Sequence, residues 1–312
     1  MLVDARRSPY GLLVKFVVTG GTGFVGKALV RRLDARGDEV TVLSRRPGTS
    51  GRVRTVAWTP GQRGSWIDAL EGVDAVVHLA GAGLFDERWT EERLLEIRRS
   101  RVEPTDVLSR AMVERAPQAA LVSASAVGLY GMRKDDAVLD EDSAHGSDVL
   151  TSMCEAWEGA ADPARAAGMR VVHPRIGIVL GQRGGALEKM LPAFRAFVGG
   201  PIGDGRQWLS WIHVDDVVSA LIYLAEQRGC AGVYNATAPN PVTMNELATT
   251  IGEVMHRPTL LRVPSAALKV VMGGGRASAL LTGQRVVPKR LLEAGFQYQY
   301  PSLRGALESI LR

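Results

Sequence analysis

The sequence has few cysteines, no long apolar run and no block of like charge, and each absence excludes a class of protein. The two cysteines among 312 residues, Cys154 and Cys230, provide neither a disulfide framework nor a metal-binding spacing, which fits a reducing cytoplasm. No apolar run approaches the roughly 18 residues that a membrane-spanning helix needs. The 38 basic and 33 acidic residues are mixed along the chain, so the net charge of +5 does not indicate a nucleic-acid-binding arm.

The composition is otherwise that of an ordinary globular chain. With 46% hydrophobic and 23% charged residues, the chain can bury a sizeable core in one large domain or two modest ones. The small excess of basic residues favours an anionic cofactor or substrate. The stretch from Met1 to Val14 lacks an apolar segment followed by a cleavage site, so we interpret it as an irregular N-terminus and not as a signal peptide.

Short apolar strands alternate with helical patterns through the first 180 residues. Strands are expected at 15–19, 39–44, 55–58, 75–79, 120–123 and 169–180, and helices at 25–35, 90–115 and 148–167. This alternation is typical of an α/β fold with a doubly wound parallel sheet. After Gly181 glycines and prolines interrupt the pattern. We therefore expect a Rossmann domain at 15–180 and a smaller substrate lobe, mainly 181–312, with some segments returning to the sheet.

The segment FVVTGGTGFVGKALV contains three spaced glycines directly between a predicted strand and a predicted helix. Glycine at these points permits a tight turn, close approach of the backbone to a pyrophosphate, and close packing of helix on strand. The helix N-terminus adds unpaired N–H groups that favour phosphate. The turn therefore predicts a dinucleotide site. Its candidate contacts are Gly20, Thr22, Gly23, Phe24, Val25 and Gly26.

The end of the second strand distinguishes NADP from NAD. An acidic residue there accepts hydrogen bonds from the ribose of NAD, whereas arginine accommodates the 2′-phosphate of NADP. This chain has Ser44, Arg45 and Arg46 at that end, and its acidic residues, Asp38 and Glu39, lie at the opposite end of the strand. Arginine suits bidentate phosphate recognition, although a solvated surface arginine is the alternative. The predicted cofactor is NADP(H), bound by Ser44 and Arg45.

Several segments resemble the extended short-chain dehydrogenase/reductases. They include VVHLAG, VSASAVGLYG, HPRIGIVLG and WIHVDDVVSAL. The stretches GGPIGDGRQWLSWIHVDD, NATAPNPVTMNELA and LLTGQRVVPKRLLEAGFQYQYPSL are similar to the atypical nucleoside-diphosphate-sugar epimerase-like branch. The resemblance covers almost the whole chain from Lys15. It implies a seven-stranded Rossmann sheet with a small C-terminal substrate lobe, and NAD(P)-dependent oxidoreduction or epimerisation of sugar-like substrates.

The resemblance adds further cofactor contacts. Small residues end the fourth strand where the cofactor crosses the sheet edge, and those of this chain are Leu79, Ala80 and Gly81. Arg101 matches a position where this branch presents an arginine to the cofactor, although a charge on the helix surface is an equal alternative. Val179 belongs to the segment 174–179, which matches the one that lines the nicotinamide in the wider family.

Two arginines are candidates for an anionic substrate. Arg175 follows a proline in the segment 174–179, and Arg206 lies in the glycine-rich stretch GGPIGDGRQ. The motif WIHVDDVV contains His213, Asp215 and Asp216, but this spacing without a second nearby histidine is a poor metal-binding set. We predict no metal, and we expect Asp215 or Asp216 to cap a helix or to lie in its first turn.

The stretch TSMCEAWEGA departs from the family pattern. In the family, a serine after the fifth strand orients the substrate oxygen, a tyrosine transfers the proton, and a lysine four positions later assists the tyrosine. Ser125 matches the serine, but Cys154 and Glu158 occupy the tyrosine and lysine positions. Cys154 is either a small packing residue or a thiol donor, and the nearby Tyr130 is either a packed loop residue or a displaced acid. The candidate catalytic set is Ser125, Tyr130, Cys154 and Glu158.

Two functions are compatible with this sequence. The first is an NADP(H)-dependent oxidoreductase or epimerase acting on a nucleotide sugar or a similar polar carbonyl or hydroxyl compound. In it Ser125 orients the oxygen, and Tyr130 or a water held by Glu158 moves the proton. The second is a catalytically inactive NADP(H)-binding sensor or regulatory protein. The expected partner is a small polar or anionic molecule, with no nucleic acid and no membrane, and the oligomeric state is left open.

Overall fold

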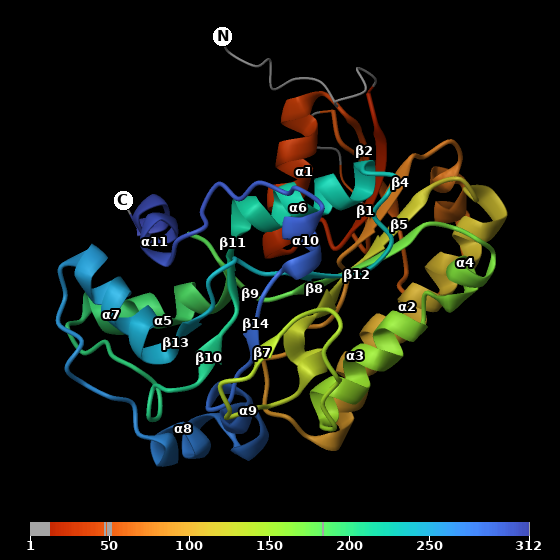
Figure 1. Cartoon of the computed structure of the whole chain (residues 1–312). Helices are drawn as coiled ribbons and strands as arrows, with labels where there is room; N and C mark the ends of the chain where they lie inside the picture. Colours follow the sequence, from red (N-terminus) through yellow and green to blue (C-terminus); the bar gives the residue numbers. More distant parts are fainter. Residues whose placement is uncertain (1–12, 47, 49–51, 183, 312) are drawn as a thin grey trace, which may run out of the picture.

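Among the residues that the structure describes, eight parallel strands form one central sheet, seven of them in one continuous order and the short β6 (Ser125–Ala126) paired with β8 beside that order (Figure 1). The structure is a computed structural model that describes residues 13–46, 48, 52–182 and 184–311. The expectation for the segment from Met1 to Val14 therefore lies almost entirely outside the described residues. Along the sheet the strands are β3 (Arg54–Ala57), β2 (Glu39–Ser44), β1 (Lys15–Thr19), β4 (Ala75–His78), β5 (Ala120–Ser123), β8 (Val171–Ile176) and β12 (Gly232–Ala236). This order confirms the doubly wound Rossmann sheet. From β1 the chain first adds strands on one side of the sheet, and from β4 it adds strands on the other side. Such sheets bind ligands at this switch point between β1 and β4.

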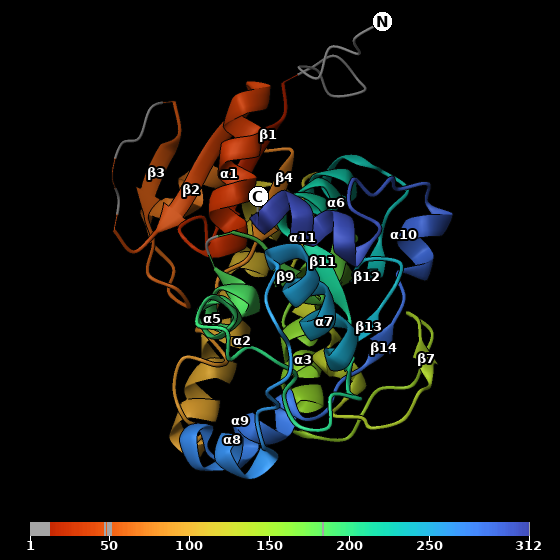
Figure 2. The ribbon, with the colours of Figure 1, turned by 90° about the vertical axis from the view of Figure 1, so that its left-hand side faces the viewer.

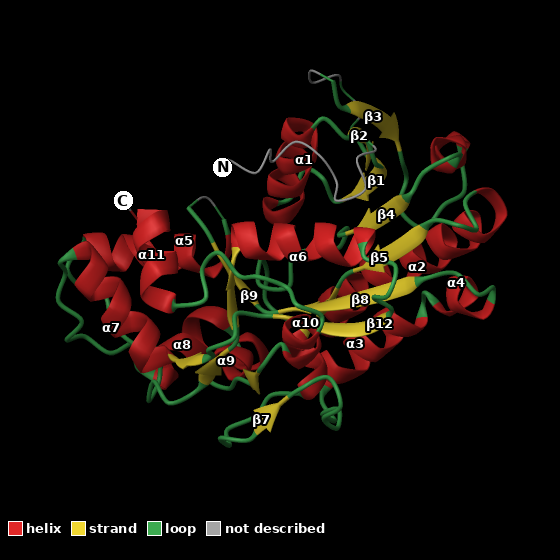
Figure 3. Ribbon diagram, turned by 45° about the horizontal axis from the view of Figure 1, so that its top comes forward, coloured by secondary structure: helices red, strands yellow, loops and turns green. Residues whose placement is uncertain are grey.

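Helices cover both faces of the sheet (Figure 3). On one face, α1 (Phe24–Arg36) and α6 (Val214–Glu226) pack on alternate residues of the strands, such as Phe16 and Val18. On the other face, α2 (Glu91–Arg115) and α4 (Asp162–Ala166) pack on the intervening residues, such as Val17 and Val76. Since both faces are buried, these strands are apolar nearly throughout, as their short apolar runs predict.

Two expected elements are divided in the structure. The helix expected at 148–167 is two helices, α3 (Val149–Gly159) and α4, because Pro163 lacks an N–H and begins a new helix instead of continuing the old one. The extended segment expected at 169–180 is β8 followed by β9 (Ile178–Leu180). Gly177 separates these strands, and a Cβ there would overlap the Ser210 carbonyl oxygen.

The second half of the chain builds a lobe beside the carboxyl ends of the strands (Figure 2). Its core lies between α5 (Gly185–Arg195), α7 (Met244–Met255) and α11 (Leu303–Leu311). Three elements of this half return to the sheet, namely α6, β12 and α10 (Lys289–Glu293), whose Leu291 joins the core on the sheet. The remaining short elements are η1 (Ser65–Leu70), η2 (Val127–Tyr130), β7 (Val138–Leu139), β10 (Trp208–Leu209), β11 (Trp211–His213), β13 (Val242–Thr243), α8 (Ser265–Met272), α9 (Gly274–Leu280) and β14 (Arg285–Val286).

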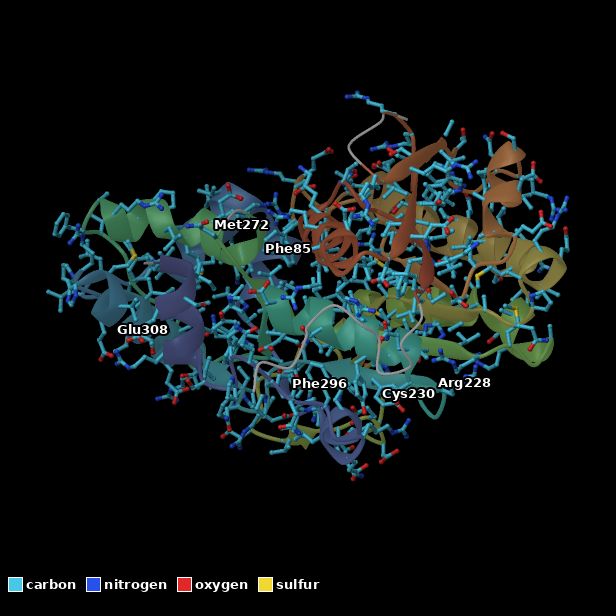
Figure 4. The ribbon with its side chains drawn as sticks, turned by 90° about the horizontal axis from the view of Figure 1, so that it is seen from above. Phe85, Arg228, Cys230, Met272, Phe296 and Glu308 are labelled. Atoms are coloured by element: carbon cyan, nitrogen blue, oxygen red, sulfur yellow. The ribbon has the colours of Figure 1, made fainter. Side chains whose placement is uncertain are left out.

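The loop after β4 connects the sheet to this lobe. Figure 4 shows Phe85 of the loop beside Met272 at the end of α8. Arg276 of α9 donates to the Phe85 carbonyl oxygen at 2.7 Å, and Arg88 donates to the Val270 carbonyl oxygen at 2.9 Å. The loop follows the carboxyl end of β4, so these bonds hold α8 and α9 close to the ligand-binding edge of the sheet.

Candidate functional site

The glycine turn after β1 has the geometry of a phosphate site. Gly20 has φ of +68°, in the left-handed region that favours glycine, and a Cβ there would lie 2.7 Å from the Leu79 carbonyl oxygen. Gly23 is the N-cap of α1 and makes no side-chain capping bond to a described residue, so the N-terminal amides of α1 remain available. Gly26 packs so tightly on Gly20 that any Cβ would overlap its carbonyl oxygen. Free amides and the helix dipole together favour a bound pyrophosphate.

Phe24 and Val179 lie where α1 meets the segment after β9. A Cβ on Gly181 or Gly184 would come within 2.6 Å of the Phe24 ring, and a Cβ on Gly185 would come within 2.6 Å of the Val179 carbonyl oxygen. The glycines therefore allow this segment to reach the N-terminus of α1. A Cβ on Gly185 would also lie 3.3 Å from the Phe24 ring, so Val179 lies beside this contact. Thr22 is exposed within the glycine turn.

Ser44 and Arg45 lie at the carboxyl end of β2, next to the end of β1. The Ser44 hydroxyl and the Arg46 backbone N–H are 3.2 Å apart and hydrogen-bonded, which tightens the chain at this end. Arg45 is exposed and forms no ion pair with a described residue. An arginine in this position is free to meet a 2′-phosphate.

Arg101 of α2 is partly buried and is not a charge on the helix surface. Its guanidinium lies 5.0 Å from the centre of the Trp157 ring and donates to the Ile97 carbonyl oxygen at 3.1 Å. A Cβ on Gly81 would lie 3.1 Å from the guanidinium carbon, so Arg101 sits against the end of β4. Burial lowers the pKa of Arg101, and no carboxylate of the described chain pairs with it. A partly buried cation without a counterion is suited to an anionic ligand.

Ser125 and Glu158 form a hydrogen bond at the centre of the predicted catalytic set. The Ser125 hydroxyl donates to Glu158 Oε1 at 2.6 Å. Arg175 Nε donates to the same oxygen at 2.9 Å, and Arg175 Nη2 donates to Glu158 Oε2 at 3.1 Å. Burial acts to raise the pKa of Glu158, but the hydrogen bonds and charge of Arg175 and the bond from Ser125 lower it overall. Glu158 is therefore an ionised carboxylate at neutral pH.

The register of three adjacent strands assembles this cluster. Ser125 of β6 pairs with Arg175 of β8, and Arg175 pairs with Asn235 of β12. Side chains of paired residues in a parallel sheet point to the same face. Glu158 reaches the row from α3, which packs on β6. Residues far apart in the sequence thus form one polar row.

Tyr130 belongs to the same network but lies in the core and not at the mouth of a cleft. It is 0% exposed, its hydroxyl accepts from Arg175 Nη1 at 3.1 Å, and it donates to Asn235 Oδ1 at 2.8 Å. Burial raises the pKa of Tyr130. The structure therefore supports Tyr130 as a packed loop residue. It does not support Tyr130 as a displaced acid at the mouth of a cleft.

Arg175 also differs from its expected role. The sequence made it a candidate for holding a substrate phosphate, but its three nitrogens donate to Glu158 and to Tyr130. Its guanidinium is buried, and the adjacent carboxylate of Glu158 raises the pKa of Arg175 against the effect of burial. Arg175 therefore neutralises and orients Glu158.

Cys154 lies one helical turn before Glu158 in α3. It is 6% exposed, and burial together with the charge of Glu158 raises the pKa of its thiol to about 12. Its sulfur packs near Gly128 of η2, where a Cβ would lie 3.8 Å away. This environment suits a packing residue and disfavours a thiolate.

The two remaining candidates lie outside this cluster. Arg206 is exposed in the turn before β10, where its backbone N–H donates to Asp204 at 3.0 Å. His213, rather than either aspartate, is the N-cap of α6, because its Nδ1 accepts from the Asp215 backbone N–H at 3.1 Å. Asp215 and Asp216 lie in the first turn, as expected, and within the described ranges no group of His, Cys, Asp or Glu has the arrangement of a metal site.

Sequence reasoning missed Asn235 and Glu141. Asn235 accepts from Tyr130, and its amide nitrogen donates to the Val287 carbonyl oxygen at 3.0 Å. Glu141 is buried and accepts from the Asn235 backbone N–H at 2.8 Å. The one sequence indication was that Asn235, like Ser125 and Arg175, is a polar residue near the carboxyl end of a buried strand.

The strand order, the glycine turn and the available amides of α1 define a dinucleotide-binding protein of the Rossmann class. A model of the NAD-dependent epimerase/dehydratase family matches residues 16–236, and the chain belongs to that family. A domain of unknown function, DUF1731, matches residues 263–310. This membership confirms the predicted resemblance to extended short-chain dehydrogenase/reductases.

The chain is similar over nearly its full length to named relatives. Epimerase family protein SDR39U1 of Homo sapiens is 39% identical over 308 residues, covering 96% of this chain and 100% of the relative. A homologue of SDR39U1 from Arabidopsis thaliana, named as chloroplastic, is 41% identical over 303 residues, covering 95% of this chain and 86% of the relative.

Solved structures share the fold. The crystal structure of human SDR39U1 (isoform2) with NADPH has a TM-score of 0.84 and 37% identity, covering 95% of this chain and 99% of that one. NADPH is the cofactor that the present sequence predicts. The structure of MoeE5 in complex with UDP-glucose and NAD has a TM-score of 0.76 and 26% identity, covering 95% and 97% of the two chains. In the described part of the present chain, no helix has the length and apolarity to cross a membrane.

Proposed function

We propose that this chain binds NADP(H) and acts as an oxidoreductase or epimerase on a nucleotide sugar or a similar polar hydroxyl or carbonyl compound. Human SDR39U1 with NADPH and MoeE5 with UDP-glucose support this cofactor and substrate class. The cofactor supplies or accepts the hydride. Its phosphates would lie on the α1 amides and its 2′-phosphate on Arg45, with Arg101 at the end of β4.

The observation that carries this proposal is the hydrogen bond from Ser125 to Glu158. As a substrate hydroxyl is oxidised, its hydride leaves the carbon and its proton passes to Ser125 Oγ, while the proton of Ser125 passes to Glu158. Glu158 is ionised and can accept a proton, but its lowered pKa makes it a weaker base than a carboxylate with a pKa near neutral pH. Ser125 and Glu158 together would thus replace the missing tyrosine, and Arg175 would hold the carboxylate.

A test of the chemistry follows 340 nm absorbance with NADP⁺ and UDP-glucose or dTDP-glucose as the probes. Glu158→Gln keeps a hydrogen-bond acceptor for Ser125 but removes the base, so turnover should fall at least about a hundredfold while NADPH binding persists. Glu158→Lys is a poorer variant, because it would place two cations together at Arg175. Unchanged turnover in Glu158→Gln would overturn the proposed base.

The second candidate function is an NADP(H)-binding sensor without turnover. It is favoured because the polar groups of the cluster already bind one another: Ser125 is 2% exposed, and Glu158 is paired with Arg175. Tight NADPH binding with neither an absorbance change at 340 nm nor formation of an epimer of UDP-glucose or dTDP-glucose would support this candidate over the enzyme. The cytoplasmic location predicted from the sequence remains a proposal, because one relative is named as chloroplastic.

The cofactor preference tests the role of Arg45. Fluorescence titration should show NADPH binding at least about tenfold more tightly than NADH, a difference of roughly 1.4 kcal/mol. Arg45→Ala should remove most of that preference. Arg304→Ala is the matched control, because Arg304 is an exposed arginine of α11 that pairs with Glu253 in the lobe. Equal affinity of the wild type for both nucleotides would contradict the assignment.

A further inference from the structure

Two helices of the lobe end with bulky residues in a backbone conformation that favours glycine. Phe197 is the second residue after α5 and has φ of +61°, and His256 directly follows α7 and has φ of +55°. Within the described ranges, no other residue except glycine has a positive φ. A side chain in this region costs energy, and helix ends usually place glycine there. Some advantage must therefore offset the strain at both helix ends.

That advantage is not burial of the Phe197 ring. The Phe197 side chain is 57% exposed, and its neighbour Val198 is exposed as well. A Cβ on Gly199 would lie 2.5 Å from the Phe194 ring, so Phe194 packs the end of α5 into the core of the lobe. The Arg257 guanidinium lies 4.3 Å from the centre of the Phe197 ring. The ring is thus held at the surface and outside the core.

The chain after α7 extends this apolar surface, because it runs beside the chain after α5. The Val263 backbone N–H donates to the Pro201 carbonyl oxygen at 3.0 Å, and a Cβ on Gly200 would overlap the Leu261 carbonyl oxygen. Leu260 is 88% exposed. Figure 1 shows the ends of α5 and α7 on the side of the lobe turned away from the central sheet. We call the exposed apolar surface there the lobe tip, formed by Phe197, Val198, Leu260 and Leu261.

The lobe tip is surrounded by positive charge. The stretches 193–203 and 254–263 contain three arginines and no aspartate or glutamate. These arginines, which form no ion pair with a described residue, are Arg195, Arg257 and Arg262. Glu253, at the end of α7, is already paired with Arg304. The unpaired cations favour an anionic partner.

An open hollow of about 720 Å³ adjoins the lobe tip and is lined by the end of α7 and by the chain from His256 to Leu260. A hollow of this kind receives an apolar anchor side chain of a partner protein, and arginines beside it pair with carboxylates next to the anchor. Symmetric pairing with a second copy of this chain would instead bring like charges together, which is unfavourable. A flat lipid surface would leave the hollow unfilled.

We propose that the lobe tip is a docking surface for an acidic segment of a partner protein. The segment would place an apolar side chain in the hollow and carboxylates on Arg257 and Arg262. Phe197 would supply an aromatic contact, and aromatic residues and arginines are the types that most often dominate binding energy at protein interfaces. The strained backbone at Phe197 and His256 holds this surface in place. The proposal does not depend on the NADP(H) site.

Fluorescence anisotropy with a synthetic probe tests the proposal. The probe is a fluorescein-labelled peptide of alternating leucine and glutamate pairs, and its control has lysine in place of glutamate. The wild type should bind only the acidic peptide, more weakly as salt is raised. Phe197→Gly removes the ring and relieves the strained backbone, so it should bind the peptide at least about tenfold more weakly yet unfold at no lower urea concentration. A residue kept only for stability would show the opposite pattern.

Two exposed leucines provide a matched pair of variants. Leu260→Ser should weaken peptide binding at least about tenfold, whereas Leu292→Ser, on α10, should keep the wild-type affinity. NADPH affinity should be unchanged in both. No binding of the acidic peptide, equal binding of the two peptides, or undiminished binding in Phe197→Gly would overturn the proposal. If Phe197→Gly does not fold, the leucine pair decides.

The other possible occupants of the lobe tip are separate outcomes of the test. Sedimentation with phosphatidylserine vesicles that bind the wild type in place of the peptide, and release Leu260→Ser, would identify a lipid surface. A dimer in sedimentation velocity that Leu260→Ser dissociates would identify a second copy of this chain. Either outcome would overturn the proposal of a protein partner.

Discussion

At the scale of single residues, Cys154 shows how burial decides the chemistry of a position. It occupies the place of the family tyrosine, yet its thiol is buried among α3 and η2 with a pKa raised to about 12. A thiol with so high a pKa transfers protons poorly near neutral pH. The proton-transfer role therefore falls to the hydrogen-bonded Ser125 and Glu158 in our proposal.

Replacing Cys154 tests this view. Cys154→Ala should leave NADPH affinity and any turnover within a few-fold, and it should lower the free energy of unfolding by about 1 kcal/mol because a small cavity forms. Urea denaturation and fluorescence titration measure these two quantities. Cys230→Ala, the other buried cysteine, is the control and should behave alike. A turnover loss of about a hundredfold or more in Cys154→Ala alone would identify the thiol as a catalytic group.

At the scale of elements, the contact between α1 and the glycine turn shapes the proposed cofactor site. The helix begins immediately after the turn, and Gly26 lies directly on Gly20. The absence of a side chain at Gly26 is therefore a packing requirement for the turn, beyond any contact with the cofactor.

This requirement predicts the effect of Gly26→Ala. The added methyl group must displace the backbone at Gly20, which should lower the free energy of unfolding by about 1–3 kcal/mol and weaken NADPH binding. Gly274→Ala is the matched control, because Gly274 starts α9 with no atom within 4 Å of a Cβ placed on it. Thermal unfolding and NADPH titration compare the two. If both variants behave alike, close packing of the turn is not what makes glycine necessary.

At the scale of the whole molecule, buried histidines make the stability of the folded state depend on pH. Burial lowers the pKa of His78, His173 and His213, three residues from different strands of the chain. Protonating such a group is easier in the unfolded chain, so the folded state loses stability as the pH falls. Buried Glu141 and Asp216 act in the opposite direction, because burial raises the pKa of each carboxyl.

The contribution of His78 can be isolated from these opposing groups. Its pKa shifts from 6.5 to about 4, so its stabilising effect is complete above pH 6.5 and is lost as the pH falls toward 4. Since each pKa unit is worth about 1.4 kcal/mol, the wild type should lose about 2–3 kcal/mol more than His78→Asn between pH 7 and pH 4.5. Urea unfolding at both pH values measures the difference. Parallel pH profiles would contradict a neutral buried His78.

The sequence by itself determined the cofactor turn, the sheet and the family. Gly20, Gly23 and Gly26 act within one short segment, so their meaning is visible without the fold. The alternation of apolar strands and helices is likewise a local pattern, and it predicted the order of elements in the first 180 residues, apart from two breaks. Pro163 divides the helix expected at 148–167, and Gly177 divides the extended segment expected at 169–180.

Only the tertiary structure decided what the polar residues do. Ser125, Arg175 and Asn235 meet because β6, β8 and β12 pair in one register, and Glu158 joins them from α3. Pairing between segments fifty and more residues apart leaves no local pattern in the sequence. For that reason Arg175 resembled a substrate ligand and Tyr130 a possible acid. Burial and neighbouring charge, which follow from packing, make the first a partner of Glu158 and the second a core residue.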